Sequence, residues 1–242
     1  MTTPKHPALD PAILHRAAER RGRRHVYDRL DPARTALVVI DLQNAFMAEG
    51  APCEVPQART VVPAVNRLAA VLRGLGGTVA WVQATFERTG WPLFFQHMVR
   101  PEASAAILAA LQAGSPMHAL WPELAVEAGD LVVQKYRFSA FLPGASTLPA
   151  MLRGRGVDTV LVAGCMTDMC CDSSARDAVM TDFRTVMVAD ANAARTDNAH
   201  LAALTAFLQG FGDVLESAEL AQALRHSAQI QDRLRLPTPS GQ

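Results

Sequence analysis

One cysteine of this chain stands where the surrounding backbone could make it a nucleophile. The segment 162–178 runs from an apolar, strand-like stretch through Gly164 into a helical pattern, for which Thr167 is the predicted N-cap. Cys170 then falls in the first turn, where the helix dipole and free backbone amides lower the pKa of a thiol. The same amides can bind the oxyanion that forms when a thiolate attacks a carbonyl. The alternative is a small core residue, the commonest role of a buried cysteine.

The neighbouring cysteines fit that second role. We expect Cys165 and Cys171 to be core residues, because Cys171 lies about 100° around the helix from Cys170 and cannot face the same pocket. Zinc needs about four ligands, and the three cysteines have no His-x-x-His or second Cys-x-x-Cys partner. We therefore predict neither a metal site nor a cofactor.

Two charged residues end apolar stretches earlier in the chain. Asp41 follows four apolar residues, and partial desolvation there would raise its pKa and suit it to proton transfer. A simple helix cap is the alternative for this carboxylate. Lys135 closes the stretch Leu-Val-Val-Gln-Lys. Its ammonium group could extend to solvent or, if buried beside a carboxylate, supply positive charge to a thiolate.

A suitable scaffold must bring these strand ends together. The apolar runs predict strands at 36–41, 78–83, 131–135, 158–163, 185–190 and 213–215, with helices near 59–75, 101–113, 145–154, 168–181 and 197–210. Continuous Val, Ile and Leu runs indicate strands buried on both faces, as in parallel sheets. We predict an α/β fold: a three-layer αβα, doubly wound domain with a six-stranded, mostly parallel sheet. Ligands of such folds bind beyond the carboxyl ends of the strands, where Asp41, Lys135 and Cys170 fall.

The remaining segments suggest three regions. Residues 1–30 are predicted to be an N-terminal helical arm, exposed in a monomer or packed on a neighbouring subunit. Residues 31–227 form the catalytic domain, and 228–242 a loose C-terminal tail. Within the domain, the long aromatic connection 84–100 is a candidate lid or pocket wall.

The composition of the chain limits the classes of binding partner that we expect. The 242 residues carry 23 basic and 23 acidic side chains, so no basic excess favours nucleic acid, and a small-molecule ligand is expected. The longest apolar runs have strand length, which predicts no membrane span, and the first residues lack the apolar core of a signal peptide. The four cysteines show no disulfide-framework spacing, which suits a reducing cytoplasm.

Three separated motifs resemble those of the isochorismatase-like cysteine hydrolases. They are the segments 38–44 with Asp41, 134–141 with Lys135 and 164–178 with Cys170, in the family's order, and the likeness covers roughly residues 33–217. The resemblance implies a catalytic triad in which Cys170 attacks the substrate carbon, Asp41 moves protons and Lys135 holds the aspartate. It also implies a cis peptide between Cys165 and Met166, with the backbone amides of Met166 and Cys170 as the oxyanion hole. Family members usually assemble as homodimers or homotetramers.

Departures from the family pattern reduce the number of reactions that the resemblance allows. The usual Thr-Asn of the cysteine motif is Thr167-Asp168, an extra carboxylate that would oppose thiolate formation unless it faces solvent. The metal-binding Asp-x-His of nicotinamidases is missing, because residues 83–88 read Gln-Ala-Thr-Phe-Glu-Arg. True isochorismatases tend to lack the nucleophilic cysteine. The sequence therefore predicts hydrolysis of a small linear amide or ureido compound, with a vinyl-ether hydrolase or a nicotinamidase-like amidase as alternatives.

Substrate recognition rests on a second set of residues. Arg195, in a segment similar to a family loop that borders the active site, is expected to bind a substrate carboxylate. The alternatives are a surface arginine or a salt bridge to Asp197. Gln43 and three aromatic residues are further candidates for substrate contact, although aromatic residues at such positions are often core residues: Phe46, Phe138 and Phe141.

Overall fold

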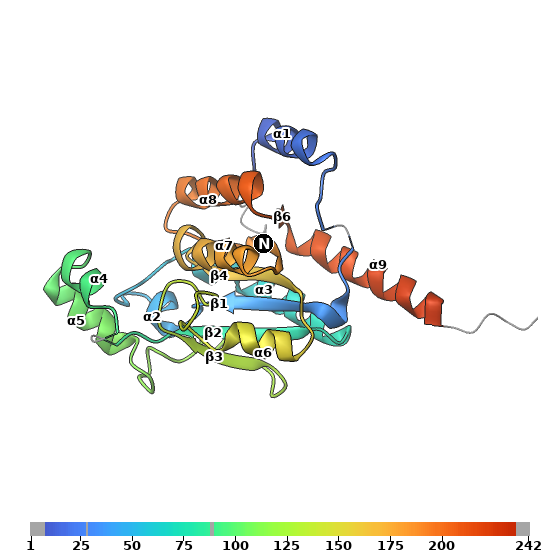
Figure 1. Cartoon of the computed structure of the whole chain (residues 1–242). Coiled ribbons are helices and arrows are strands. Elements are labelled where there is room, and N and C mark those ends of the chain that lie inside the picture. The colour runs from blue at the N-terminus through green and yellow to red at the C-terminus, as the bar shows by residue number, and fades with distance from the viewer. Residues whose placement is uncertain (1–7, 28, 88–89, 236–242) are drawn as a thin grey trace, which may run out of the picture.

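The strands form one parallel sheet in the computed structural model, which describes residues 8–27, 29–87 and 90–235 (Figure 1). They are β1 (Thr35–Ile40), β2 (Thr78–Ala84), β3 (Leu131–Lys135), β4 (Thr159–Cys165), β5 (Arg184–Ala193) and β6 (Asp213–Leu215). Their order in the sheet is β3-β2-β1-β4-β5-β6, and every neighbouring pair is parallel. The predicted α/β, doubly wound, six-stranded fold is confirmed.

Burial of the strands follows their place in the sheet. Every residue of β1, β2 and β4 is buried, as their unbroken apolar runs predicted. The edge strand β3 differs, because its residues alternate between buried and exposed and Val132 is 52% exposed. The expectation of burial on both faces was wrong for β3, which lies at the edge of the sheet and exposes alternate residues.

Helices cover both faces of the sheet. One apolar core lies between the sheet and the helices α3 (Ala58–Gly74) and α9 (Ser217–Arg235). The other lies beneath α6 (Leu148–Gly154), α7 (Asp172–Met180) and α8 (Asp197–Gly210). Shorter elements complete the described chain: η1 (Pro32–Arg34), α2 (Asn44–Met47), α4 (Pro92–His97), α5 (Pro101–Ala110) and η2 (Thr167–Cys171).

The C-terminal part of the chain departs from the predicted boundaries. Helix α9 was not predicted, although Leu220 and Leu224, four residues apart, are its fully buried residues. It continues to Arg235 and so crosses the boundary placed at residue 227, which makes the expectation of a loose segment wrong as far as Arg235. Residues 236–242 of the predicted tail lie outside the described residues.

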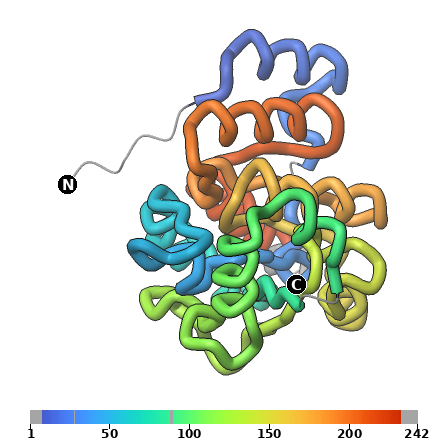
Figure 2. The backbone as a smooth tube through the Cα atoms, turned by 90° about the vertical axis from the view of Figure 1, so that its left-hand side faces the viewer, coloured from blue at the N-terminus to red at the C-terminus, as the bar shows by residue number. Residues whose placement is uncertain are grey.

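The N-terminal arm contains the predicted helix, α1 (Pro11–Arg21), which packs against α8 of the same chain (Figures 1 and 2). The carboxylate of Asp10 caps the start of α1 by accepting a hydrogen bond from the amide of Ala12, at 2.8 Å. At the other end, Arg21 lies 2.7 Å from the fully buried Asp213 at the start of β6. The arm is thus joined to the sheet edge of its own chain.

Candidate active site

The site lies at the switch point of the sheet, between β1 and β4. The chain proceeds outward from β1 to β2 and β3 and then returns to the other side of β1, which leaves a crevice beyond the carboxyl ends of β1 and β4. Gly164 allows these strands to approach closely, because a Cβ there would lie 2.0 Å from the carbonyl oxygen of Ile40. Asp41 follows Ile40, and Cys165 follows Gly164. The close approach therefore brings the two motifs into contact.

The backbone at Asp41 has an unusual conformation, with φ at 56°. Left-handed φ values are uncommon outside glycine and cluster at functional sites. The amide of Asp41 donates to the carbonyl oxygen of Val82 on β2, at 2.9 Å, so this turn is tied to the neighbouring strand. It leaves the carboxylate fully buried at the end of the sheet.

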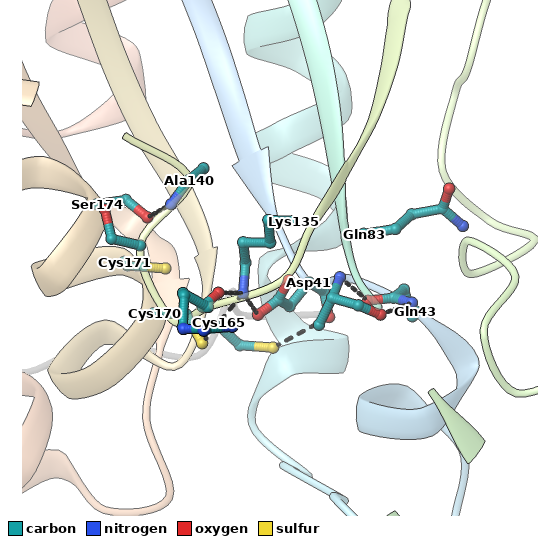
Figure 3. Close-up of polar contacts among 12 residues, drawn as sticks. Asp41, Gln43, Gln83, Lys135, Ala140, Cys165, Cys170, Cys171 and Ser174 are labelled. Carbon is teal, nitrogen blue, oxygen red and sulfur yellow. Dashed lines mark hydrogen bonds and ion pairs between the residues drawn. The ribbon is translucent and has the colours of Figure 1, made fainter. Parts of the chain in front are cut away.

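Lys135 connects the aspartate and the cysteine (Figure 3). Its Nζ lies 2.9 Å from Oδ2 of Asp41 and donates to Sγ of Cys170, at 3.5 Å. It also donates to the carbonyl oxygen of Arg137, at 3.1 Å. All three donors of the ammonium group are therefore engaged. Lys135 is fully buried, so the alternative in which it extends to solvent is excluded.

Asp41, Lys135 and Cys170 form a buried trio, and the charge of each member shifts the pKa of the others. Burial raises the pKa of Asp41, and the positive charge of Lys135 opposes that rise. Burial alone would lower the pKa of Lys135, but the charges of Asp41 and Cys170 outweigh it and raise the pKa. Burial, together with the charge of Asp41, raises the pKa of the Cys170 thiol. The expected lowering of that pKa was therefore wrong in direction, and Cys170 needs a base to become a thiolate.

The turn that carries Cys170 is a short π-helical turn, η2, in which the amide of Cys171 donates to the carbonyl oxygen of Met166, at 3.1 Å. Such turns are rare in proteins, and those that occur often lie at functional sites. Met166, not Thr167, is the N-cap, so the predicted cap was wrong. The peptide between Cys165 and Met166 is cis, as the resemblance implied. Asp168 is exposed, and its charge is not among the causes that raise the pKa of Cys170.

The two neighbouring cysteines belong to the core, as expected. Cys165 is fully buried and its thiol donates to the carbonyl oxygen of Asp41, at 3.4 Å. The Sγ of Cys171, also fully buried, lies 3.9 Å from the carbonyl oxygen of Ala163. Their thiols therefore point to the backbone of β4 and of the β1 end, while Cys170 faces Lys135.

The side-chain amide of Gln43 is occupied by the backbone. Its Nε2 donates to the carbonyl oxygens of His118 and Ala84, and its Oε1 accepts from the amide of Ala84 at 2.7 Å. The His118 ring lies in turn 2.7 Å from the hydroxyl of Thr85, and its burial lowers its pKa. His118 is not among the residues that the sequence predicted for the site. In the structure, Gln43 and His118 hold the end of β2 beside the site.

The aromatic residues predicted to contact the substrate lie in two places, beside the site and in the apolar core. Phe138 belongs to an aromatic cluster formed by rings of the connection after β2 and of β3's end: Phe86, Trp91, Phe94, Phe95 and Phe138. The cluster borders the trio, because Nζ of Lys135 lies 5.7 Å from the Phe86 ring. Phe46 is partly buried beside the cluster. Phe141 is 1% exposed and its ring packs on Phe183, which fits the alternative of a core residue.

One residue, Arg137, joins the aromatic cluster to the trio through its side chain and its backbone. The guanidinium of Arg137 lies 5.3 Å from the Trp91 ring and donates to the carbonyl oxygen of Gly90, at 2.6 Å. The backbone carbonyl of the same residue accepts from Lys135. The segment predicted as a lid or pocket wall is therefore fastened next to the buried lysine.

Arg195 lies in the turn between β5 and α8, and its side chain is exposed. Its carbonyl oxygen accepts from Nε2 of Gln57, at 3.2 Å. Among the described residues it forms no salt bridge with Asp197. Burial raises the pKa of Cys53 to about 11, and the charge of Arg195 opposes this rise while that of Asp41 adds to it. Cys53 thus lies within electrostatic reach of both residues.

The described residues lack two features. They contain no group of three or more His, Cys, Asp or Glu side chains placed to hold a metal ion. Within the same residues, the helices are all too short or too polar to span a bilayer.

Comparisons with known proteins agree with this architecture. The isochorismatase domain model matches residues 35–219. A maleamate amidohydrolase of Pseudomonas putida is 32% identical over 193 residues, which cover 80% of this chain and 88% of that protein. A ureidoacrylate amidohydrolase of Methylobacterium radiotolerans is 32% identical, with 81% of each chain covered. The solved cysteine hydrolase of Pseudomonas syringae pv. phaseolicola is similar in fold, with a TM-score of 0.73, 24% identity, and coverage of 82% of this chain and 95% of that one.

Proposed function

The chain belongs to the isochorismatase family, and from this premise we propose that it cleaves the C–N bond of a small linear amide or ureido compound through a covalent intermediate on Cys170. It is a hydrolytic enzyme that acts on amides, as are the amidohydrolases to which it is similar. The observation that carries the proposal is the buried trio, in which Lys135 contacts both Asp41, at 2.9 Å, and Cys170, at 3.5 Å.

In the first half of the reaction, Asp41 acts as the base. The thiol of Cys170 lies within hydrogen-bond reach of the Asp41 carboxylate, which can therefore take the thiol proton. The thiolate, stabilised by Lys135, attacks the carbonyl carbon of the substrate. The backbone amides of Met166 and Cys170 donate to the resulting oxyanion. Asp41 then returns the proton to the leaving nitrogen, and ammonia departs while the acyl or carbamoyl group stays on sulfur.

In the second half, Asp41 removes a proton from water. The resulting hydroxide attacks the carbon of the thioester or thiocarbamate, and the C–S bond breaks. The proton held by Asp41 passes to the sulfur of Cys170, so the enzyme returns to its starting state. No cofactor is required by either half-reaction.

The proposed substrate carries a carboxylate near the amide. Arg195 is exposed and forms no salt bridge with Asp197 among the described residues. The charges of Arg195 and Asp41 both act on the pKa of Cys53, so both residues lie near that thiol. A guanidinium there can bind a carboxylate in bidentate geometry. Maleamate and ureidoacrylate, the compounds in the names of the two similar amidohydrolases, are both carboxylates. Phe46 and Phe138 would contact the apolar part of such a substrate. We further propose that the enzyme works in the cytoplasm as a homodimer or homotetramer.

Ammonia release from a panel of amides tests the proposal. The panel contains ureidoacrylate, maleamate, N-carbamoylsarcosine, biuret and nicotinamide. We expect turnover of a carboxylate-bearing member, and its loss in Cys170→Ala. Cys171→Ala is the matched control, because it makes the same change one residue away in a side chain directed at Ala163. Full turnover by Cys170→Ala would contradict the covalent mechanism and favour chemistry that depends on Asp41 alone, such as vinyl-ether hydrolysis.

A further inference from the structure

The turn that carries the nucleophile is attached to a helix from a distant part of the sequence. Oγ1 of Thr167 lies 2.8 Å from Nδ1 of His200, which is a hydrogen-bond distance. Thr167 is fully buried and His200 is 3% exposed. Because the bond is shielded from water, each group would lose a partner that solvent could not replace.

The two residues stand at defined points of their elements. Thr167 is the first residue of η2, the turn that also holds Cys170. His200 lies in the first turn of α8, which packs against both η2 and α7 (Figure 1). The hydroxyl of Thr196 caps α8 by accepting from the amide of Ala199, at 3.2 Å. The start of α8 is therefore a fixed point, and the Thr167–His200 bond transmits its position to η2.

Few other side-chain bonds hold this turn. Within the described residues, the other side-chain hydrogen bonds of η2 are those of Cys170 with Lys135 and Asp41 and the long contact of Cys171 with Ala163, at 3.9 Å. The hydrogen bonds of Cys170 belong to the trio itself. The Thr167–His200 bond is thus the short, buried side-chain bond that joins the turn to a helix.

We propose that Thr167 and His200 are positioning residues of the reaction: their bond keeps Sγ of Cys170 within reach of Lys135 and Asp41. The inference rests on the proposed function, since it assigns these residues to the same site. Both residues are buried, and neither is among those proposed to contact the substrate. Productive geometry tolerates displacements of about 0.5 Å, so a small shift of η2 would separate Cys170 from its base and reduce the rate without removing a substrate contact.

Four variants and one control test the proposal. Thr167→Val and His200→Ala each remove the bond. Thr167→Ser keeps the hydroxyl, and His200→Asn places an amide near the position of Nδ1. The control is Thr185→Val, which removes an equally buried hydroxyl that donates to the carbonyl oxygen of Phe183, at 3.1 Å, away from the site. It measures the effect of a lost buried hydroxyl on the fold alone.

We expect Thr167→Val and His200→Ala to lower kcat by about 10- to 100-fold, as small misplacements do. KM should change by less than about threefold, because the substrate contacts remain. The double variant should be no slower than either single variant, since one bond is lost in all three. Thr167→Ser and His200→Asn should recover most of the rate, and Thr185→Val should keep it. Additive losses in the double variant, or no recovery in the conservative variants, would overturn the proposal.

Alkylation of Cys170 by iodoacetamide provides a measurement that needs no substrate. Mass spectrometry of the modified peptides follows Cys170, with Cys53 of the same molecule as the internal reference. We expect slower alkylation of Cys170 in Thr167→Val and His200→Ala, because the thiol is held away from Asp41, and an unchanged rate at Cys53. Equal or faster alkylation of Cys170 would overturn the positioning role. If the wild-type protein released no ammonia from any amide, the proposed function would fail, and the alkylation rates would still decide this inference.

Discussion

At the scale of single residues, the site depends on two buried charges that compensate each other. Asp41 and Lys135 are both fully buried, with Nζ and Oδ2 2.9 Å apart. Taking either charge out of water is costly, and the attraction of the pair repays that cost only while both members are present. The same two residues are proposed to carry the proton transfers. Stability and activity should therefore respond differently to their removal.

Lys135→Met keeps the volume of the side chain and removes its charge. We expect the variant to lose about 3–5 kcal/mol of unfolding free energy, because Asp41 is left as an uncompensated buried charge. Adding Asp41→Asn to Lys135→Met should restore much of this stability, since no buried charge remains. Neither variant should hydrolyse amides. Urea denaturation and ammonia release measure the two properties, and a double variant less stable than Lys135→Met would contradict the compensation.

The acid limit of activity reports on Asp41. Burial raises the pKa of this carboxyl group, and Lys135 offsets the rise only in part. The carboxylate must be ionised to accept the thiol proton, so kcat/KM should fall as the pH drops through a pKa above the ordinary value of about 3.9. Asp168→Asn is the control, because it neutralises an exposed carboxylate of η2, and it should leave the acid limit unchanged. An acid limit at or below the ordinary value would argue against Asp41 as the base.

At the scale of elements, the contact between β1 and β4 brings the motifs together. Gly164 has φ at 119°, and a Cβ there would lie 2.0 Å from the carbonyl oxygen of Ile40. The obstacle is backbone, which cannot rotate aside as a side chain can. Any other residue would therefore push β4 away from the turn at Asp41.

Gly164→Ala should accordingly destabilise the fold by more than about 3 kcal/mol, from overpacking and an unfavourable φ together. Gly156→Ala is the control, because its φ of 73° is also positive while no atom lies within 4 Å of the added Cβ. It should cost only about 1–2 kcal/mol. Urea midpoints compare the two, and similar losses would show that backbone conformation, not the contact with Ile40, is what requires glycine at residue 164.

The elements also show which parts of the site could be read from sequence. Asp41, Lys135 and Cys170 each follow or end an apolar run, and the topology rule for parallel sheets places such residues together. The bond between Thr167 and His200 could not be predicted in this way, because it depends on how α8 packs against η2. The π-helical form of η2 has no local sequence signal either. The direction of the Cys170 pKa was missed because the sequence does not show that the thiol is fully buried beside Asp41, and both effects raise its pKa.

At the scale of the whole molecule, the N-terminal arm is held by a second buried ion pair. Asp213 accepts from Nη1 of Arg21, at 2.7 Å, and from the amides of Val26 and Tyr27. Arg21 also donates to the carbonyl oxygen of Gly212, at 2.7 Å. One carboxylate at the edge of the sheet therefore fixes both the end of α1 and the segment that follows it. The arm packs on α8, on the side of that helix away from the sheet (Figure 1).

The arm should detach when this carboxylate is neutralised. Asp213→Asn leaves Arg21 without its charge partner in a site where the two side chains are 10% and 0% exposed, so we expect a loss of about 3–5 kcal/mol and rapid proteolysis within residues 8–27. Glu219→Gln is the matched control, because its partner Arg24 lies 3.8 Å away and both side chains are well exposed. A surface pair of this kind should contribute less than about 1 kcal/mol. The trio lies at the carboxyl ends of β1, β3 and β4, whereas the ion pair of the arm lies at the start of β6. KM of Asp213→Asn should therefore match the wild type. A raised KM with the oligomer dissociated, seen by light scattering, would instead place the arm in the pocket of a neighbouring subunit.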